Sequence, residues 1–258
     1  MRILTALFLL LFPCGFALAK PPEVSDEAIG RVKKAAKDGI PNAQYLLAQS
    51  YEMGVGVPKD SAEAVKWFRK AADQGLASAQ YHLGLMYDKG NGVPKDSAEA
   101  AKWYRKSADQ GLASAQYNLG VMYATGDGVP KDSAEAAKWY RKSADQGHAG
   151  AQYNLGLMYD NGDGVPKDSA EAVKWFRKAA EQGNAVAQNI LGAMYARGDG
   201  VPKDLVQAHA WHNIAGAAGL KQAKELLEIL EELMTSEQKA EAMKLARETF
   251  ERIGANKR

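Results

Sequence analysis

Three short motifs contain residue types that could support catalysis or metal binding. Ser236 and Lys239 match the S-x-x-K pattern of a serine nucleophile with a lysine partner, but no S-D-N or K-T-G motif completes that catalytic set. Residues 160–164, Asp-Asn-Gly-Asp-Gly, resemble the start of a calcium loop, yet the glutamate that should close the loop is absent. His209 and His212 lie three residues apart and provide at most half of a metal site. We therefore expect a helix cap at Ser236, a glycine-rich turn at 160–164, and ordinary surface or groove positions for the histidines.

A fixed period of 36 residues runs through the chain and explains most of its unusual residues. Three residue types keep this step in five places: Trp67, Trp103, Trp139, Trp175 and Trp211; Pro58, Pro94, Pro130, Pro166 and Pro202; Tyr51, Tyr87, Tyr123, Tyr159 and Tyr195. Such a period predicts stacked copies of one supersecondary unit. A residue that recurs in every copy is needed by the repeat, so the tryptophans are predicted to be core residues and not ligand contacts.

The first half of each copy has the spacing of an amphipathic helix. In the second copy Ala79, Leu83 and Tyr87 are spaced i, i+4 and i+8 and form one stripe. Gly84 recurs at the next position in later copies, although glycine costs up to ~1 kcal/mol inside a helix relative to alanine. We therefore expect a close approach between helices at this glycine.

The second half of each copy is predicted to be an antiparallel helix with defined ends. A loop with paired glycines precedes it, and Asp96 with Glu99 then forms a pattern like a capping box. Gly111 is expected to end the helix as a C-terminal cap. The sequence thus predicts an all-α fold, a right-handed α/α superhelical solenoid of five helix-turn-helix repeats with capping helices.

The repeats divide the chain into four segments. We predict a signal peptide at 1–19, an N-terminal capping helix at 20–41, five repeats at 42–221 and C-terminal capping helices at 222–258. The last of these helices, with Leu245 and Phe250 among its apolar residues, should present a charged outer face to water, as terminal caps of repeat arrays do.

The repeated unit resembles the Sel-1-like repeat, a relative of the tetratricopeptide repeat. The shared pattern is A-x-x-x-L-G-x-x-Y-x-x-G-x-G-V-x-x-D-x-x-x-A-x-x-W-[FY]-x-x-[AS]-A-x-x-G, and it covers most of the chain in consecutive copies. The resemblance implies a concave face lined by the first helices and used for binding proteins or peptides. Some cysteine-rich relatives are described as binding or hydrolysing β-lactams, but their cysteine pairs are absent here.

A row of tyrosines and aliphatic residues lies on the first helices, opposite the packing stripe. By the tetratricopeptide resemblance this row lines the inner groove, where aromatic side chains give a partner a large contact area. An alternative is that the tyrosines pack against neighbouring repeats and belong to the fold. The candidate partner-binding residues of this groove are Tyr45, Tyr81, Leu85, Asp88, Tyr117, Val121, Tyr153, Leu157 and Asp160.

The N-terminus has the features of an export signal. Arg2 precedes an apolar run at 3–12, and residues 17–19, Ala-Leu-Ala, offer a small-x-small cleavage pattern. Cleavage after Ala19 would remove the only cysteine, Cys14, whose alternative role as a lipidated residue is disfavoured by the proline before it. We expect a periplasmic or secreted protein with no membrane insertion after cleavage.

Charge narrows the class of partner. Removing Arg2 with the signal leaves 32 of the 33 Lys and Arg residues against 31 Asp and Glu, so the mature chain is almost neutral. This is not the charge pattern of a nucleic-acid-binding protein. We predict a non-catalytic scaffold of the cell envelope that binds a protein or peptide, without metal or cofactor. The alternatives are a secreted β-lactam-binding hydrolase and a secreted factor that contacts a host, and the sequence leaves the oligomeric state open.

Overall fold

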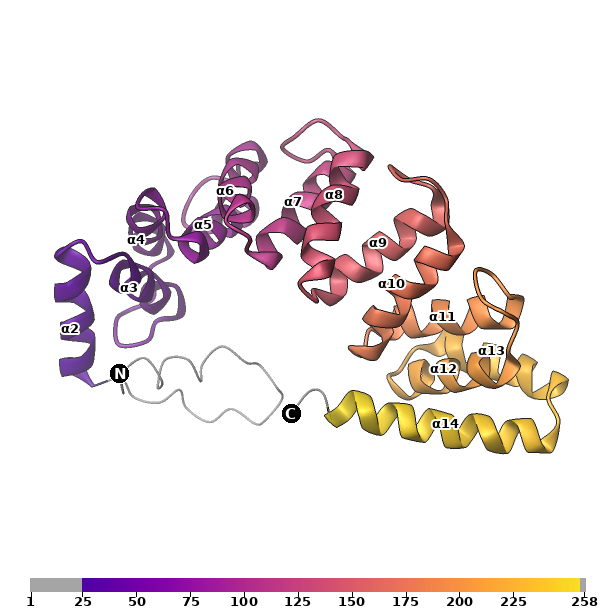
Figure 1. Ribbon diagram of the computed structural model, residues 1–258. Helices are drawn as coiled ribbons and strands as arrows, with labels where there is room; N and C mark the ends of the chain where they lie inside the picture. Colours follow the sequence, from indigo (N-terminus) through magenta and orange to yellow (C-terminus); the bar gives the residue numbers. More distant parts are fainter. Residues whose placement is uncertain (1–24, 256–258) are drawn as a thin grey trace. The chain divides into compact units, whose positions relative to one another are not determined.

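The computed structural model describes residues 25–255, which form thirteen α-helices and no strand (Figure 1). The predicted signal peptide, its cleavage site and Cys14 lie outside these residues. The helix bounds are α2 Asp26–Lys37, α3 Pro41–Met53, α4 Ser61–Asp73, α5 Ala77–Lys89, α6 Ser97–Asp109, α7 Ala113–Thr125, α8 Ser133–Asp145, α9 Ala149–Asn161, α10 Ser169–Glu181, α11 Ala185–Arg197, α12 Leu205–Ala217, α13 Lys221–Leu233 and α14 Ser236–Ala255. The predicted all-α class is confirmed.

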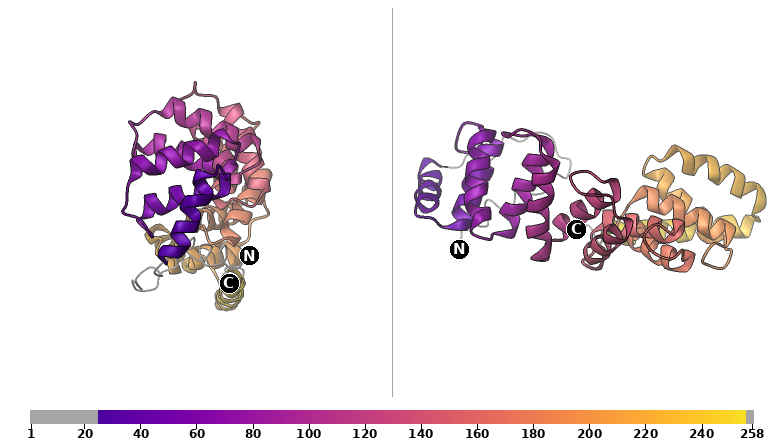
Figure 2. Two further views of the ribbon diagram at one scale, coloured as in Figure 1. Left: turned by 90° about the vertical axis from the view of Figure 1, so that its left-hand side faces the viewer. Right: turned by 90° about the horizontal axis from the view of Figure 1, so that it is seen from above.

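The helices belong to two compact units. Unit 1 ends at Gln110 and contains α2 to α6, and unit 2 begins at Gly111 and contains α7 to α14. In both units the first helix of a repeat packs against the second helix of the same repeat and against the second helix of the preceding repeat. Figure 2 shows these antiparallel pairs side by side within each unit, which is the packing of an α/α solenoid.

The ends of the second helices are fixed by their own side chains. Asp132 accepts a 2.9 Å hydrogen bond from the backbone N–H of Glu135, and the corresponding aspartates of the other copies do the same. The capping box is only half formed, because the Glu135 side chain does not return to the cap. It accepts instead from Trp139 Nε1 at 2.9 Å and from Lys138 at 3.0 Å, while the Asp132 N–H donates to the carbonyl of Tyr123. In the second, third and fourth copies the glutamate of the pattern thus orients the tryptophan, with Nε1 donating to Glu99, Glu135 or Glu171.

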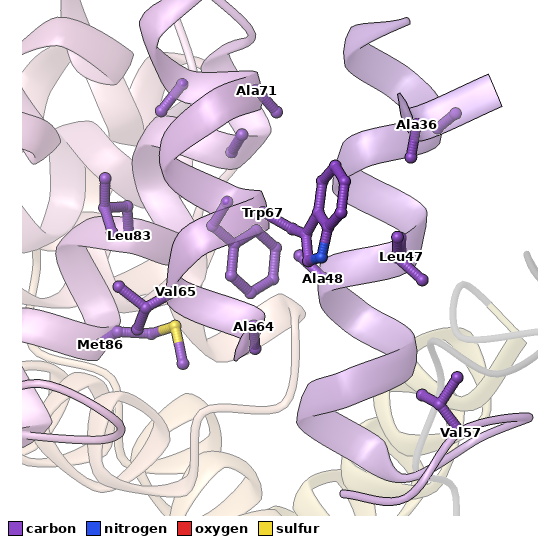
Figure 3. Close-up of a cluster of buried hydrophobic side chains, with 14 of the residues drawn as sticks. Ala36, Leu47, Ala48, Val57, Ala64, Val65, Trp67, Ala71, Leu83 and Met86 are labelled. Atoms are coloured by element: carbon purple, nitrogen blue, oxygen red, sulfur yellow. The ribbon is translucent and has the colours of Figure 1, made fainter. Parts of the chain in front are cut away.

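The tryptophans are core residues, as predicted. Their exposed fractions are only 4–8%. Figure 3 shows Trp67 extending from α4 toward the helix that carries Leu47 and Ala48. A lysine one turn later lies over each of the first four tryptophan rings, with Nζ about 4 Å from the ring centre, as a cation–π contact: Lys70, Lys106, Lys142 and Lys178.

The recurrent glycine of the first helices is a site of close approach, again as predicted. A Cβ added at Gly84 would lie 2.7 Å from Tyr104 Cδ1, and one at Gly156 would lie 2.8 Å from Phe176 Cδ1. These distances are below van der Waals contact, so any side chain there would push the two helices of a repeat apart.

Buried glutamines connect successive repeats inside each unit. Gln152 donates to the carbonyl of Ala144 in the preceding repeat and accepts a 2.7 Å hydrogen bond from Gln182 of its own repeat. Gln80 does the same with Ala72 and Gln110 in unit 1. In the fifth copy Ala218 stands at the place of the second glutamine, and Gln188 Oε1 is left buried without a partner.

The two ends of the array correct three predictions. Pro41 is the first residue of α3 and not part of the N-terminal cap. Thr235, not Ser236, caps α14, since its hydroxyl accepts from the N–H of Gln238 while the Gln238 side chain accepts from the Thr235 N–H. Phe250 is 56% exposed, because the helix packs on α12 through a different face that includes Ala242 and Ala246.

Candidate functional site

The candidate groove residues lie on one face of the first helices, which we call the first-helix face. Unit 1 carries part of the set on α3 and α5: Tyr45, Tyr81, Leu85 and Asp88. Unit 2 carries the rest on α7 and α9: Tyr117, Val121, Tyr153, Leu157 and Asp160. All nine side chains are half-buried, so each one combines contacts inside the fold with some accessible surface.

The four tyrosines of this set pack within their own repeats. Each ring is tilted against the aromatic ring of the second helix, with centroids 5.6–6.1 Å apart, in the pairs Tyr45–Phe68, Tyr81–Tyr104, Tyr117–Tyr140 and Tyr153–Phe176. These pairs give the tyrosines a structural role in their own repeats, and Tyr45 also meets the His82 ring of the next repeat, with centroids 5.4 Å apart.

The first-helix face of unit 2 is hollowed between the end of α7, α8 and α9. A pocket of about 310 Å³ is lined there by one predicted residue, Leu157, and by Ala124, Lys131, Ser133, Tyr140, Asn154, Met158, Asn161 and Asp163. Its wall therefore combines aliphatic surface with amide, hydroxyl and charged groups. Asn154 and Asn161 were not among the residues predicted from the sequence, although asparagine also occurs at the position of Asn154 in the preceding copy, as Asn118.

Tyr140 forms the floor of this pocket and is held by Asn154. Burial raises the pKa of the Tyr140 phenol to about 12, and the hydrogen bond with Asn154 partly opposes that effect. The phenol is therefore neutral over the physiological pH range and remains available as a hydrogen-bonding group. Lys131 and Asp163 bring opposite charges to the same pocket.

The corresponding face of unit 1 is more aromatic. His82 stacks on Phe68 with centroids 5.1 Å apart and meets the edges of Tyr45 and Tyr81. Burial, with a smaller contribution from Lys89, lowers the pKa of His82 to about 4, so the ring is neutral at pH 7. Its Nδ1 lies 3.9 Å from Glu52, a carboxyl whose pKa is raised by burial.

The fifth copy replaces an aromatic pair by a polar one. Asn189 stands at the tyrosine position and His212 at the Phe/Tyr position, and His212 Nδ1 lies 2.8 Å from Asn189 Oδ1. Since the oxygen can only accept, Nδ1 carries the proton. His209 and His212 are only 2% and 1% exposed. The expectation of surface or groove histidines is therefore wrong for this pair, because both side chains replace core residues of the repeat.

The remaining motifs of the sequence have structural roles where they lie. Residues 160–164 span the end of α9 and the turn after it, with Gly162 and Gly164 in the left-handed region at φ +82° and +70°. Ser236 is exposed in the first turn of α14. Within residues 25–255, no three His, Cys, Asp or Glu side chains are grouped so that they could hold a metal ion. None of the described helices is long and apolar enough to cross a bilayer.

The geometry defines a class of protein built from stacked helix pairs, in which the tryptophan, glycine and glutamine of each 36-residue copy maintain the stack. The sequence matches the Sel1 repeat at residues 41–76, 77–112, 113–148, 149–184 and 185–220. The chain belongs to the Sel1 repeat family. Each matched copy begins one residue before the predicted boundary.

Two solved structures with this repeat are similar along most of the chain. A protective antigen present in uropathogenic Escherichia coli strains is 38% identical over 88% of this chain, with a TM-score of 0.80. A Sel1 repeat protein from Oxalobacter formigenes is 36% identical over 87% of this chain and 88% of its own, with a TM-score of 0.76. This chain spans about half (49%) of the length of the Escherichia coli protein. A comparison with curated protein sequences gave no match.

Proposed function

We propose that this protein is a non-catalytic scaffold of the cell envelope that binds a peptide or partner protein on its first-helix face. Sel1 repeat proteins are in general scaffolds for protein interaction. The single observation that carries the proposal for this chain is the pocket at α8 and α9, where Leu157 lies beside the amide groups of Asn154 and Asn161.

The chemistry of this pocket suits a polypeptide segment better than a reaction. An aliphatic wall accepts an apolar side chain, and an asparagine amide can both donate to a backbone carbonyl and accept from a backbone N–H. Small-molecule and peptide sites commonly combine an apolar surface with a few placed polar groups in this way. Of the residues that line the pocket, Ser133 is a possible nucleophile and Lys131 a possible base, but no hydrogen bond joins their side chains, as the activation of a nucleophile requires.

The envelope location rests on the N-terminal sequence. The charged start, short apolar run and Ala-Leu-Ala pattern of residues 17–19 are those of a cleaved export signal. The test is cell fractionation followed by N-terminal sequencing of the mature protein. A mature N-terminus at Lys20 in the periplasmic or secreted fraction is expected, and an unprocessed chain in the cytoplasm would contradict this part of the proposal.

The binding role is tested by crosslinking in intact cells with variants of the pocket. Leu157→Asp and Asn154→Ala alter groups that the pocket exposes, and Lys174→Ala is the matched control because Lys174 is a solvent-exposed residue on the second helix α10. We expect the wild type and the control to capture the same partner and both pocket variants to lose it while keeping the helical circular-dichroism spectrum of the wild type. A lower melting temperature is expected for Asn154→Ala, because it removes the hydrogen bond to the buried Tyr140 phenol. Capture that is unaffected by the pocket variants would exclude this face.

A further inference from the structure

The second helix of the fifth repeat, α12, has lost the charges that its counterparts carry. Four positions that are Lys, Arg, Lys and Asp or Glu in each of the first four copies are Ala210, Asn213, Ile214 and Ala217 here. In those copies the lysine at the Ile214 position lies over the tryptophan ring and reaches solvent. The outer side of α12 is therefore apolar where the repeat is otherwise charged.

The final helix explains part of this change. α14 packs on α12, and Ala210 and Ile214 are only 2% and 3% exposed beneath it. At its other edge α14 reaches α10, where Arg252 lies 3.7 Å from Glu181. The buried positions of α14 itself are Ala242, Ala246, Thr249 and Ile253.

The helix α14 also exposes apolar side chains along one of its own edges. Met243 and Phe250 lie two turns apart on α14 and are 60% and 56% exposed. Between α14 and α12 a pocket of about 300 Å³ is lined by these two residues and by Asn213, Ile214, Ala217, Ala246 and Arg247. Arg247 is the only charged residue in this lining, so the pocket is an apolar groove with a guanidinium at its rim.

We propose that this α12–α14 groove is a second docking surface, which binds an acidic amphipathic helix of a partner protein. The groove is formed by residues other than those of the first-helix face, so the proposal goes beyond the scaffold function proposed above. The apolar side chains of a bound helix would pack against Met243 and Phe250, and a carboxylate beside them would meet Arg247.

The length and charge of the groove favour an acidic amphipathic helix as the bound partner. Met243 and Phe250 are separated by seven residues, or about 10 Å along the helix, which matches apolar anchors spaced i, i+3 or i+4, and i+7 on a partner helix. Arginine binds carboxylates through two parallel hydrogen bonds, which favours Glu or Asp beside the anchors over Lys. Lys244, next to Met243, adds a second positive charge on α14, and Glu251, next to Phe250, adds one negative charge.

The test uses the mature chain and a fluorescent synthetic helix of about 18 residues, long enough to be helical in isolation. The peptide has leucines at i, i+4 and i+7 with glutamates beside them, and a matched peptide has lysine in place of each glutamate. Fluorescence anisotropy measures the binding of both peptides to the wild type, Phe250→Ser, Arg247→Gln and Val186→Ser. Val186 is the matched control, because it is an exposed apolar residue (44%) on α11 of the same unit.

We expect the glutamate peptide to bind the wild type and Val186→Ser equally, and Phe250→Ser about tenfold or more weakly, as for loss of an aromatic anchor. Arg247→Gln should weaken the binding of the glutamate peptide and reduce the difference in affinity between the glutamate and lysine peptides. No binding, equal binding of both peptides, or unchanged binding to Phe250→Ser would overturn the proposal. Self-association of the wild type that Phe250→Ser abolishes in light scattering would also overturn it, since the groove would then hold a second copy.

Discussion

At the scale of single residues, the packing of a repeat depends on pairs of a glycine in the first helix and a ring in the second helix. The missing side chain at Gly156 makes room for the Phe176 ring, as Gly84 does for Tyr104. In the fifth copy Gly192 makes room for His212 in the same way, with the added Cβ only 3.0 Å from the imidazole. A substitution at one member of such a pair should therefore act through the other.

Gly156→Ala is expected to destabilise unit 2 although alanine is the better helix former. The added methyl meets Phe176 ring carbons at 2.8 Å, and overpacking of this kind costs roughly 1–3 kcal/mol. Gly254→Ala is the matched control, because Gly254 is a helical, exposed glycine with no atom within 4 Å of the added Cβ. Chemical denaturation should show a loss of unfolding free energy for the first variant and an unchanged or slightly higher value for the second. Equal effects of the two variants would contradict the close-packing explanation.

The buried His212 predicts a loss of stability in acid. Burial, with a smaller contribution from His209, lowers the pKa of His212 to about 4, below the value of about 6.5 for an unfolded histidine. The unfolded chain therefore takes up a proton before the folded chain does, and the unfolding free energy falls as the pH drops from 6.5 to about 4. A shift of this size corresponds to roughly 3 kcal/mol when complete.

The double variant Asn189→Tyr/His212→Phe restores the aromatic pair of the fourth copy, Tyr153 with Phe176. The double variant should fold and lose the fall in unfolding free energy that arises from His212. The fall that arises from His82, whose pKa is also lowered to about 4, should remain. The test is to measure the unfolding free energy of the wild type and of the double variant between pH 7 and 4. Parallel curves for the two proteins would show that His212 does not titrate in this range.

At the scale of elements, the glutamine contacts between helices show where the array is incomplete. Gln182, the residue just after α10, donates to Gln152 of α9 at 2.7 Å and also to the Gly147 carbonyl at 2.9 Å. The fifth repeat has no such donor, and Gln188 Oε1 is buried without a hydrogen bond. An unsatisfied buried acceptor is a cost that a single side chain could remove.

Ala218→Gln is accordingly expected to stabilise the protein. The new amide lies 30 residues after Gln188, the same separation as between Gln182 and Gln152, and Ala218 is exposed, so the larger side chain has space. One added hydrogen bond to a buried acceptor contributes on the order of 1 kcal/mol. The matched variant Gln182→Ala should lose a similar amount, and thermal unfolding of both is the measurement. A lower melting temperature for Ala218→Gln would show that the new amide does not form the hydrogen bond to Gln188 in the last repeat.

At the scale of the whole molecule, the C-terminal helix is needed because the last repeat is apolar on its outer side. Removal of residues 235–258 would expose Ala210, Ile214 and part of Trp211, and exposed apolar patches promote association. We expect the truncated chain to melt at a lower temperature and to aggregate. Adding Ala210→Lys and Ile214→Lys to the truncation restores the charges of the other copies and should restore a monodisperse protein in light scattering. A truncated chain that is as stable and soluble as the wild type would mean that α14 is dispensable for folding.

The sequence by itself determined the repeat, its helices and its core. Period and capping aspartates are local signals that repeat five times, and the close-approach glycine repeats four times, so the all-α class, the buried tryptophans and the close approach at Gly84 follow directly from them. The same reasoning misjudged His209, His212 and Phe250, because these residues lie where the pattern breaks.

Only the tertiary structure decided the features that arise between elements. Asn189 and His212 are 23 residues apart and form one hydrogen bond, which neither residue indicates alone. The pocket beside Leu157 needs residues from three helices and from the loops that follow α7 and α9, and the α12–α14 groove exists because α14 packs on α12. The physical reason is that helix periodicity fixes which side of a helix is apolar, whereas the partner that covers that side is selected by packing over long separations in sequence.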